Sequence, residues 1–454
     1  MRSHRFFLLL GPSLFLIICL FQPFSENPKG VFSIGVITWM LVWWLSEVVP
    51  MAITALLPLL LFSMGGLMSM EDCLVSYSDK YVFLFLAGFI LALAIEKWNL
   101  HRYFAQWIIS KTGKSPKAIV AGLMLSTYFI SMWISNTATA IMMLPLVLAM
   151  TQNTSHHVPI AIKKIMVLGI AYAASIGGMA TLLGSPPNAA MAGILLKEYN
   201  ISISFWDWFQ WGFPFSIILL IICFIVLIAH VKKEDWVQCE IATNIEKTSL
   251  NTPQKRVLIY FVIIAMLWIF QGPISAILGN WFNDTFIGLS VAILFFISWK
   301  KEPLLEWSET QKLPWGILLM FGGGLCLANG FKAGGILEWI AYLFEGHLTF
   351  NFTFILLLTA CGLILTALMS NLAMVALFIP IVGQIAIQMN LSPFVLALPV
   401  TLASSCDFMF PMSTPPNAIA YSSGHVSARQ MFGIGVVLNM GALLLLMVWM
   451  KWMM

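Results

Sequence analysis

Charged residues are scarce in this sequence: they make up 9% of its 454 residues, whereas hydrophobic residues make up 60%. A soluble protein of this size carries about a quarter charged residues, so the composition excludes an ordinary soluble domain, and no nucleic-acid partner is expected. Long apolar runs of this kind need lipid as their solvent. The alternation of polar and apolar residues that marks a membrane β-barrel is also missing. We therefore predict an all-α membrane protein that crosses the bilayer many times.

Signatures of catalysis and of bound cofactors are missing as well. The seven cysteines are scattered and show no Cys-x-x-Cys or Cys/His ligand spacing, so they are interpreted as packing residues. The glycine run 322–324 lacks the strand and helix context of a nucleotide-binding loop. No ATP-binding motif and no catalytic set of side chains is found. The sequence thus indicates a carrier without a cofactor rather than a pump or an enzyme.

The lysines and arginines, 23 in all, indicate how the chain crosses the membrane, because basic residues concentrate in cytoplasmic segments. With the N-terminus inside and two hairpins that re-enter the membrane and return to the same side, 18 of the 23 fall inside. If 118–150 were instead one simple span, Lys163 through Lys312 would move outside. The predicted hairpins are 118–150 and 352–389, and the eleven predicted spans are 6–22, 30–46, 48–64, 80–97, 163–196, 211–230, 255–272, 284–299, 314–330, 393–421 and 431–450.

Two short polar motifs occur once in each half of the chain and in the same order. Ser131-Met-Trp-Ile-Ser135-Asn136-Thr137 is matched 235 residues later by Thr366-Ala-Leu-Met-Ser370-Asn371-Leu372. Each is followed by Pro-Pro-Asn-Ala, and we predict helix breaks there, at 184–188 and 413–417. Doubled helix-interrupting motifs are typical of transporters whose site lies between inverted repeats. The predicted units are an additional N-terminal helix (1–28), the first inverted repeat (29–230), a cytoplasmic linker (231–254) and the second inverted repeat (255–454).

Interrupted helices at membrane depth expose main-chain groups that need partners. Proline removes a donor, and Gly184 allows two backbones to approach closely. Freed carbonyls and hydroxyls are ligands for a small cation such as Na⁺, whereas freed amides at helix N-termini attract anions. Because the motifs contain almost no lysine or arginine, bound Na⁺ is the natural counter-charge for an anion. The binding of the two ions would then be thermodynamically coupled.

The paired Ser-Asn tips and Pro-Pro-Asn-Ala breaks, with Glu47-Val-Val-Pro50 and Thr54-Ala-Leu-Leu-Pro58, resemble the divalent anion/sodium symporter family over nearly the whole chain. The resemblance implies two Na⁺ sites, one substrate site between them, a homodimer and an elevator movement. It implies a first Na⁺ site of Ser131, Ser135, Asn136 and the Gly184 carbonyl, and a second of Thr366, the Met369 carbonyl, Asn371 and the Ser413 carbonyl. The implied substrate-binding residues are Ser135, Asn136, Thr137, Ser370, Asn371, Thr414 and Pro415.

Two residues stand out from this pattern. Leu372 stands where many members of that family have Thr or Val, and its side chain cannot donate a hydrogen bond to a substrate. Asp407 is a rare ionisable residue inside a predicted span, which makes it a candidate for binding a cation or a proton. The alternative for Asp407 is a solvated or paired position near a helix end. Asn188 and Asn417, at the two breaks, are further candidates.

The sequence therefore predicts a secondary active transporter in the plasma (inner) membrane with a cytoplasmic N-terminus. It would carry a divalent anion with Na⁺, and a C4-dicarboxylate such as succinate is the predicted substrate. An anion exchanger, a sulfate or citrate symporter, and coupling to H⁺ in place of Na⁺ are alternatives on the same fold. A channel and an intramembrane hydrolase that uses a serine are alternatives from other classes.

Overall fold

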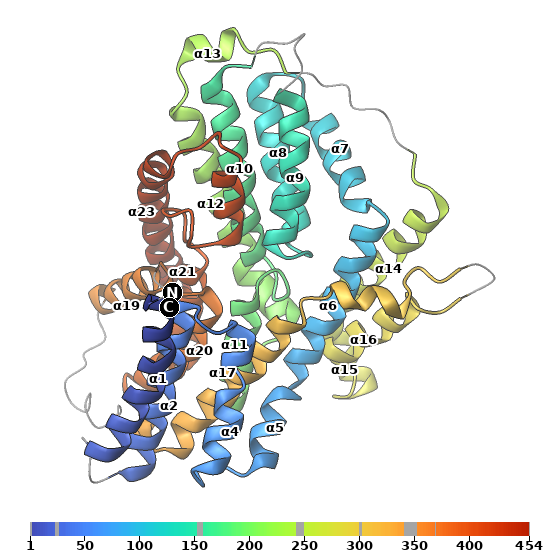
Figure 1. Cartoon of the computed structure of the whole chain (residues 1–454). Helices are drawn as coiled ribbons and strands as arrows, with labels where there is room; N and C mark the ends of the chain where they lie inside the picture. The colour runs from blue at the N-terminus through green and yellow to red at the C-terminus, as the bar shows by residue number, and fades with distance from the viewer. Residues whose placement is uncertain are drawn as a thin grey trace.

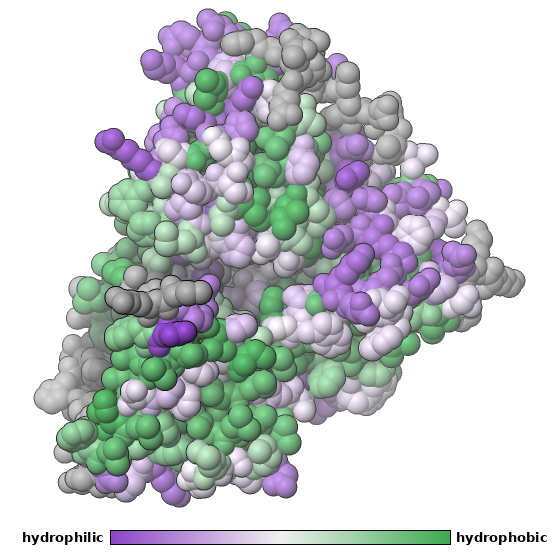
Figure 2. Space-filling model, in the orientation of Figure 1, coloured by the Kyte–Doolittle hydropathy of each residue, from purple (hydrophilic) through white to green (hydrophobic). Residues whose placement is uncertain are grey.

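The computed structural model describes residues 2–22, 27–151, 158–241, 249–298, 302–339, 352–367 and 369–453. Its regular elements are helices, and none of these residues lies in a strand. Nine helical segments in this part of the chain are long and apolar enough to cross a bilayer. Hydrophobic residues cover the lower left face, over the N-terminal helices, and hydrophilic residues gather at the upper end (Figures 1 and 2). The predicted all-α polytopic membrane fold is confirmed.

The N-terminal helices differ from the prediction in two places. They are α1 (Arg2–Phe21), α2 (Pro28–Ser46), α3 (Met51–Thr54), α4 (Leu57–Met64), α5 (Met70–Tyr77) and α6 (Lys80–Lys97). The prediction of one helix over 48–64 is wrong, because Pro58 cannot donate to a preceding turn and instead lies in the first turn of α4. Helix α5 was not predicted. Ser69 caps it by accepting a hydrogen bond from the Asp72 main-chain nitrogen at 3.0 Å.

The first half of the chain contains a hairpin and a broken helix. After α7 (Leu100–Thr112), α8 (Pro116–Ser131) packs against α9 (Asn136–Thr151), which matches the predicted hairpin at 118–150. Helices α10 (Ile160–Met179) and α11 (Pro186–Tyr199) are separated by 180–185, so the break lies slightly ahead of the predicted 184–188. Pro186 begins α11, since the first turn of a helix does not need the missing N–H. Helix α12 (Phe205–Ala229) ends this half.

The second half repeats this order. The linker contains α13 (Lys233–Val237), and its residues 242–248 lie outside the described part of the chain. The helices that follow are α14 (Thr252–Ile269), α15 (Gln271–Leu278), α16 (Asp284–Leu294), η1 (Trp307–Lys312), α17 (Trp315–Ala333), α19 (Phe352–Thr366), α20 (Asn371–Gln388), α21 (Pro393–Ser404), α22 (Pro415–Ser422) and α23 (Ala428–Met453). The break between α21 and α22 covers 405–414, and Pro415 begins α22. The inverted-repeat division stays a prediction, which this matched order supports.

The two halves interlock around their broken helices. Helix α11 packs against α20, α21 and α17, and α10 packs against α22. The Tyr172 hydroxyl donates to the Phe408 carbonyl at 3.0 Å, and the Tyr199 hydroxyl donates to the Pro380 carbonyl at 2.5 Å. Figure 1 shows α8, α9, α10 and α12 side by side in the upper part of the molecule, with α11, α17 and α20 below them. Segments far apart in sequence therefore share one core.

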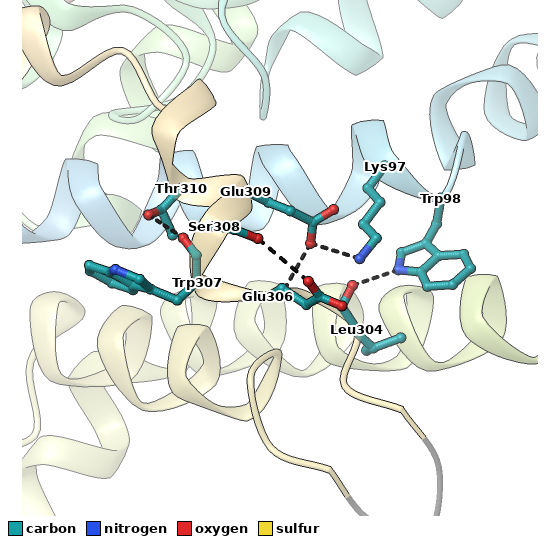
Figure 3. A network of polar contacts seen from close by, with 8 residues as sticks. All are labelled: Lys97, Trp98, Leu304, Glu306, Trp307, Ser308, Glu309 and Thr310. Atoms are coloured by element: carbon teal, nitrogen blue, oxygen red, sulfur yellow. Dashed lines mark hydrogen bonds and ion pairs between the residues drawn. The ribbon is translucent and has the colours of Figure 1, made fainter.

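A polar network joins the end of α6 to η1 and the residues just before it, ahead of α17 (Figure 3). Lys97 Nζ lies 2.7 Å from Glu309 Oε2, and the Trp98 indole donates to the Leu304 carbonyl at 3.0 Å. The Glu306 main-chain nitrogen also donates to Glu309 Oε2, at 2.8 Å. Partly exposed ion pairs of this kind contribute little to stability by themselves. The network holds η1, which leads into α17, against the end of α6.

The contact between α17 and the α3–α4 junction should be sensitive to one added methyl group. A Cβ at Gly323 would overlap the Ala55 carbonyl oxygen, whereas a Cβ at Gly272 would meet nothing within 4 Å. Overpacking of this kind costs about 1–3 kcal/mol. We expect Gly323→Ala to lower the melting temperature of the purified protein in detergent by several degrees and Gly272→Ala to change it much less. Equal melting temperatures for the two variants would contradict this packing.

Candidate functional site

A cavity of about 270 Å³ lies where both hairpin tips and both helix breaks meet. Ten of the predicted site residues line it: Ser135, Asn136, Thr137, Gly184, Ser370, Asn371, Leu372, Ser413, Thr414 and Pro415. Residues 135–137 and 370–372 are thus brought together from positions more than 230 residues apart. The volume is below the roughly 300–1,000 Å³ of pockets for drug-sized ligands. The cavity therefore suits a small solute.

The walls of the cavity differ in character. The hairpin tips and breaks supply hydroxyl, amide and main-chain groups, whereas α6 supplies Phe85 and Phe89 and α17 supplies Ile317 and Met320. No Asp, Glu, Lys, Arg or His of the described residues lines it. A bound ion would therefore meet neutral dipoles on one side and an apolar surface on the other.

Four helices begin at this cavity. The first residues of α9, α20, α11 and α22 are Asn136, Asn371, Pro186 and Pro415, and all four line it. Each helix N-terminus carries a partial positive charge. The first residues of α9 and α20 also offer main-chain N–H groups, whereas α11 and α22 begin with Pro-Pro, which has no N–H to donate. Ser135 and Ser370 cap α9 and α20 in the same way, each accepting from a main-chain nitrogen at 3.3 Å. Together these helix ends make the cavity attractive to an anion without any charged side chain.

Behind the first tip lies a cluster of three oxygen atoms. The Ser131 hydroxyl is 2.8 Å from Asn136 Oδ1 and 2.7 Å from the Ala174 carbonyl oxygen. Ser131 is fully buried and does not line the cavity. One hydroxyl proton cannot satisfy both acceptors well, so this oxygen-rich group suits a small hard cation such as Na⁺.

The second tip has the same arrangement. The Thr366 hydroxyl lies 2.7 Å from Asn371 Oδ1 and 2.8 Å from the Ser404 carbonyl oxygen. The pairs Ser131–Asn136 and Thr366–Asn371 were predicted from sequence. The carbonyls of Ala174 and Ser404 were not, although each residue lies nine or ten positions before Gly184 or Ser413. Met369, the remaining predicted ligand, is half-buried and does not line the cavity.

The asparagines of the Pro-Pro-Asn-Ala motifs hold the two breaks in shape. Asn188 Nδ2 donates to the carbonyls of Gly178 and Thr181 at 2.9 and 2.8 Å. Asn417 Nδ2 donates to the carbonyls of Asp407 and Phe410 at 2.9 and 3.1 Å. In both breaks the acceptors lie ten and seven residues before the asparagine. Asn188 and Asn417 are fully buried and outside the cavity lining, so the structure gives them a positioning role.

Thr181 links the first tip to the first break, and sequence reasoning missed it. Its hydroxyl donates to the Met132 carbonyl at 2.6 Å and accepts from the Gly184 nitrogen at 2.9 Å. Gly184 lies so close to Gly178 that an added Cβ would be 2.7 Å from the Gly178 carbonyl oxygen. The sequence does show a hydroxyl residue three positions before Gly184. A threonine in an apolar helix does not by itself predict a contact with a hairpin tip, however, because such residues commonly form hydrogen bonds between helices.

Comparisons with known proteins agree with this arrangement. The family described as "Sodium:sulfate symporter transmembrane region" matches residues 4–454. The sodium-dependent dicarboxylate transporter SdcS of Staphylococcus saprophyticus is 34% identical over 461 residues, covering 95% of this chain and 88% of that protein. The same-named protein of Staphylococcus aureus is 33% identical over 459 residues, with the same coverage.

Two solved transporter structures share the fold at low sequence identity. The YdaH transporter of Alcanivorax borkumensis superposes with a TM-score of 0.59 at 11% identity, covering 84% of this chain and 87% of that chain. MtrF of Neisseria gonorrhoeae gives a TM-score of 0.57 at 10% identity, covering 84% of this chain and 83% of that chain. At this identity the likeness concerns the fold alone.

Gly178 sets the position of the Asn136 side chain, which gives a direct test. A Cβ at Gly178 would overlap Asn136 Oδ1, whereas one at Gly433 would meet nothing within 4 Å. Displacing Asn136 would cost about 1–3 kcal/mol. We expect Gly178→Ala to raise the Na⁺ concentration that half-stabilises the purified protein against heat about fivefold or more, and Gly433→Ala to leave it unchanged. The same Na⁺ midpoint in all three proteins would show that Asn136 is not held in place for a cation.

Proposed function

We propose that this chain, which belongs to the sodium:sulfate symporter family, is a secondary active transporter that couples the uptake of a divalent anion to Na⁺. Its proposed substrate is a C4-dicarboxylate such as succinate. The observation that carries this proposal is the uncharged cavity at which four helices begin and which both Ser-Asn tips line. The relatives described as sodium-dependent dicarboxylate transporters support the choice of ion and substrate class.

The anion would be bound by neutral donors. The proposed substrate ligands are the side chains and helix N-termini at Ser135, Asn136, Thr137, Ser370, Asn371 and Thr414, with Pro415, which has no donor, lining the site beside them. Two Ser-Asn tips that line one small cavity match a solute with a carboxylate at each end. A divalent anion among neutral dipoles still lacks a counter-charge, and moving it into a poorly solvated cavity is costly.

Na⁺ would supply that counter-charge. The oxygen clusters around Ser131 and Thr366 share Asn136 and Asn371 with the cavity wall. The first proposed Na⁺ site is Ser131, Ser135, Asn136 and the Gly184 carbonyl, and the second is Thr366, the Met369 carbonyl, Asn371 and the Ser413 carbonyl. Because each asparagine belongs to a cation site and to the anion site, binding of one ion favours the other. This linkage is the physical basis of symport.

The contrast between the cavity walls supports an elevator movement. All the proposed ligands belong to the hairpins and breaks, whereas α6 and α17 contribute only apolar side chains to the cavity. A unit that carries its ligands can slide along an apolar wall without breaking hydrogen bonds to it. We propose that the hairpins, α10–α12 and α21–α23 move against the remaining helices. We also propose a homodimer in the plasma membrane with a cytoplasmic N-terminus.

Transport by proteoliposomes that contain the purified chain tests the proposal. Labelled succinate should enter empty vesicles when Na⁺ is outside and should not enter when choline replaces Na⁺. Uptake that needs internal dicarboxylate but not Na⁺ would instead identify an exchanger. Competition by unlabelled citrate and sulfate would show whether either is the better substrate. Current without saturable uptake would identify a channel.

Replacing each tip asparagine tests the cation sites. Asn136→Ala and Asn371→Ala each remove an oxygen from a different cluster. Each should raise the Na⁺ concentration for half-maximal uptake about tenfold, as expected for a lost contact of ~1.4 kcal/mol. Asn280→Ala, at an exposed position, is the matched control. Unchanged Na⁺ dependence in both tip variants would refute the assignment.

Leu372 tests the substrate end of the second tip. Its side chain lines the cavity where the first tip has Thr137. Leu372→Thr adds a donor and should change the relative uptake of succinate, citrate and sulfate about tenfold, since a donor to a charged acceptor contributes about 1.5–3 kcal/mol. The Na⁺ concentration for half-maximal uptake should change much less. Leu372→Val, which adds no donor, should keep the wild-type preference, and an identical preference in all three proteins would contradict the placement.

A further inference from the structure

Asp407 is a buried carboxylate whose charge nothing in the described structure balances. It lies in the break between α21 and α22, is 1% exposed, and neither of its side-chain oxygens has a hydrogen-bond partner there. The one ion pair found among the described residues joins Lys97 to Glu309 and does not involve it. An unpaired charge at such depth is costly. A mobile positive ion is therefore required if the carboxylate is ionised.

The surroundings of Asp407 are rich in oxygen. The nearby Ser413 hydroxyl directs its hydrogen bonds to main-chain oxygens, at 2.7 Å for Phe410 and 3.5 Å for Asp407 itself. Asn417 turns its NH₂ group to the Asp407 and Phe410 carbonyls, and its own Oδ1 is left without a donor. The Ser405 hydroxyl is also buried and unpartnered. Buried acceptors without donors are groups that a bound cation can satisfy.

The first break offers a comparison within the same chain. Beside the first break, Ser175 near the end of α10 and Asn188 Oδ1 in α11 are unpartnered, as Ser405 and Asn417 Oδ1 are at the second break. The position ten residues before the asparagine is Gly178, at the end of α10, in the first half and Asp407, inside the break, in the second. Both breaks thus present neutral oxygens, but only the second adds a negative charge.

We propose that Asp407 is an anionic ligand of the cation at the second break, so that this site binds Na⁺ in the absence of any dicarboxylate. This inference rests on the proposed function only for the identity of the ion. The first site is built from neutral oxygens and gains its affinity from the anion beside it. The second site carries its own counter-charge and fills first. Na⁺ at the second site then orders Thr366 and Asn371 before the substrate arrives.

The test is Na⁺ binding by the purified full-length chain without substrate. The melting temperature is measured in detergent against increasing NaCl, with choline chloride keeping the ionic strength constant. Wild-type protein should be stabilised by Na⁺ alone. Asp407→Asn keeps the shape and removes the charge, so the Na⁺ midpoint should rise at least about tenfold. In choline alone the variant should be as stable as wild type or more stable, because an uncompensated buried charge has been removed.

Asp284→Asn is the matched control. Asp284 is also a buried aspartate, 8% exposed, but it accepts a hydrogen bond from the Phe205 nitrogen and does not line the cavity. The Na⁺ concentration that gives half of the stabilisation should be the same for Asp284→Asn as for wild type. Asp407→Ser, which keeps an oxygen without the charge, should behave as Asp407→Asn does and provides a second variant if one folds poorly.

Three results would overturn the inference. The first is that the Na⁺ concentration giving half of the stabilisation is the same in both Asp407 variants as in wild type. The second is that Na⁺ stabilises wild type only when dicarboxylate is present. The third is that the variants change the pH dependence of stability but not its Na⁺ dependence. The last would identify Asp407 as a proton-binding group. Failure of the proposed function would look different. A chain that binds Na⁺ as described but transports no divalent anion would contradict the proposed function and leave this inference intact.

Discussion

The structure depends on how main-chain groups are satisfied where helices stop inside the membrane. Each break frees carbonyls that no water in lipid can solvate. Asn188 and Asn417 each bind two of these carbonyls with one NH₂ group. Pro186 and Pro415 start the next helix at the only place where a missing N–H has no cost. The Pro-Pro-Asn-Ala motif thus ends one helix, holds the gap open and begins another.

The consequences extend to the cavity. With the freed carbonyls held by asparagine, the remaining free groups are helix N-termini that face the cavity and oxygens behind the tips. The helix N-termini attract negative charge, and the oxygens behind the tips attract positive charge. A lysine or arginine in the cavity would bind the anion tightly whether or not Na⁺ is present. Anion binding would then no longer depend on Na⁺. In the proposed mechanism the uncharged cavity keeps substrate affinity low until cations are present, which is what coupled transport requires.

The sequence predicts this site well where the signal is local and doubled. The span at 80–97, both hairpins and the convergence of the two Ser-Asn tips follow from hydrophobic length and motif order. The sequence cannot show which main-chain groups the tips contact. The Ser131 and Thr366 hydroxyls bond to the carbonyls of Ala174 and Ser404, which lie in apolar helices, and every residue has a carbonyl whatever its type. The Phe85 and Ile317 wall resembles any buried helix face in the sequence. The break in 48–64 was missed because its prolines lie in an otherwise continuous apolar run.

The two halves share a backbone plan but not a charge distribution. Thr137 and Leu372 occupy matching tip positions, so a donor in the first half is an alkyl group in the second. Gly178 and Asp407 each lie ten residues before the asparagine of their motif, so a close backbone contact in the first half is replaced by a carboxylate in the second. A site made of two identical halves would hold both ends of a substrate and both cations alike. If the proposed sites are right, the second half binds the substrate with fewer donors and adds the charge of Asp407, so its affinity for cations depends less on the anion between them.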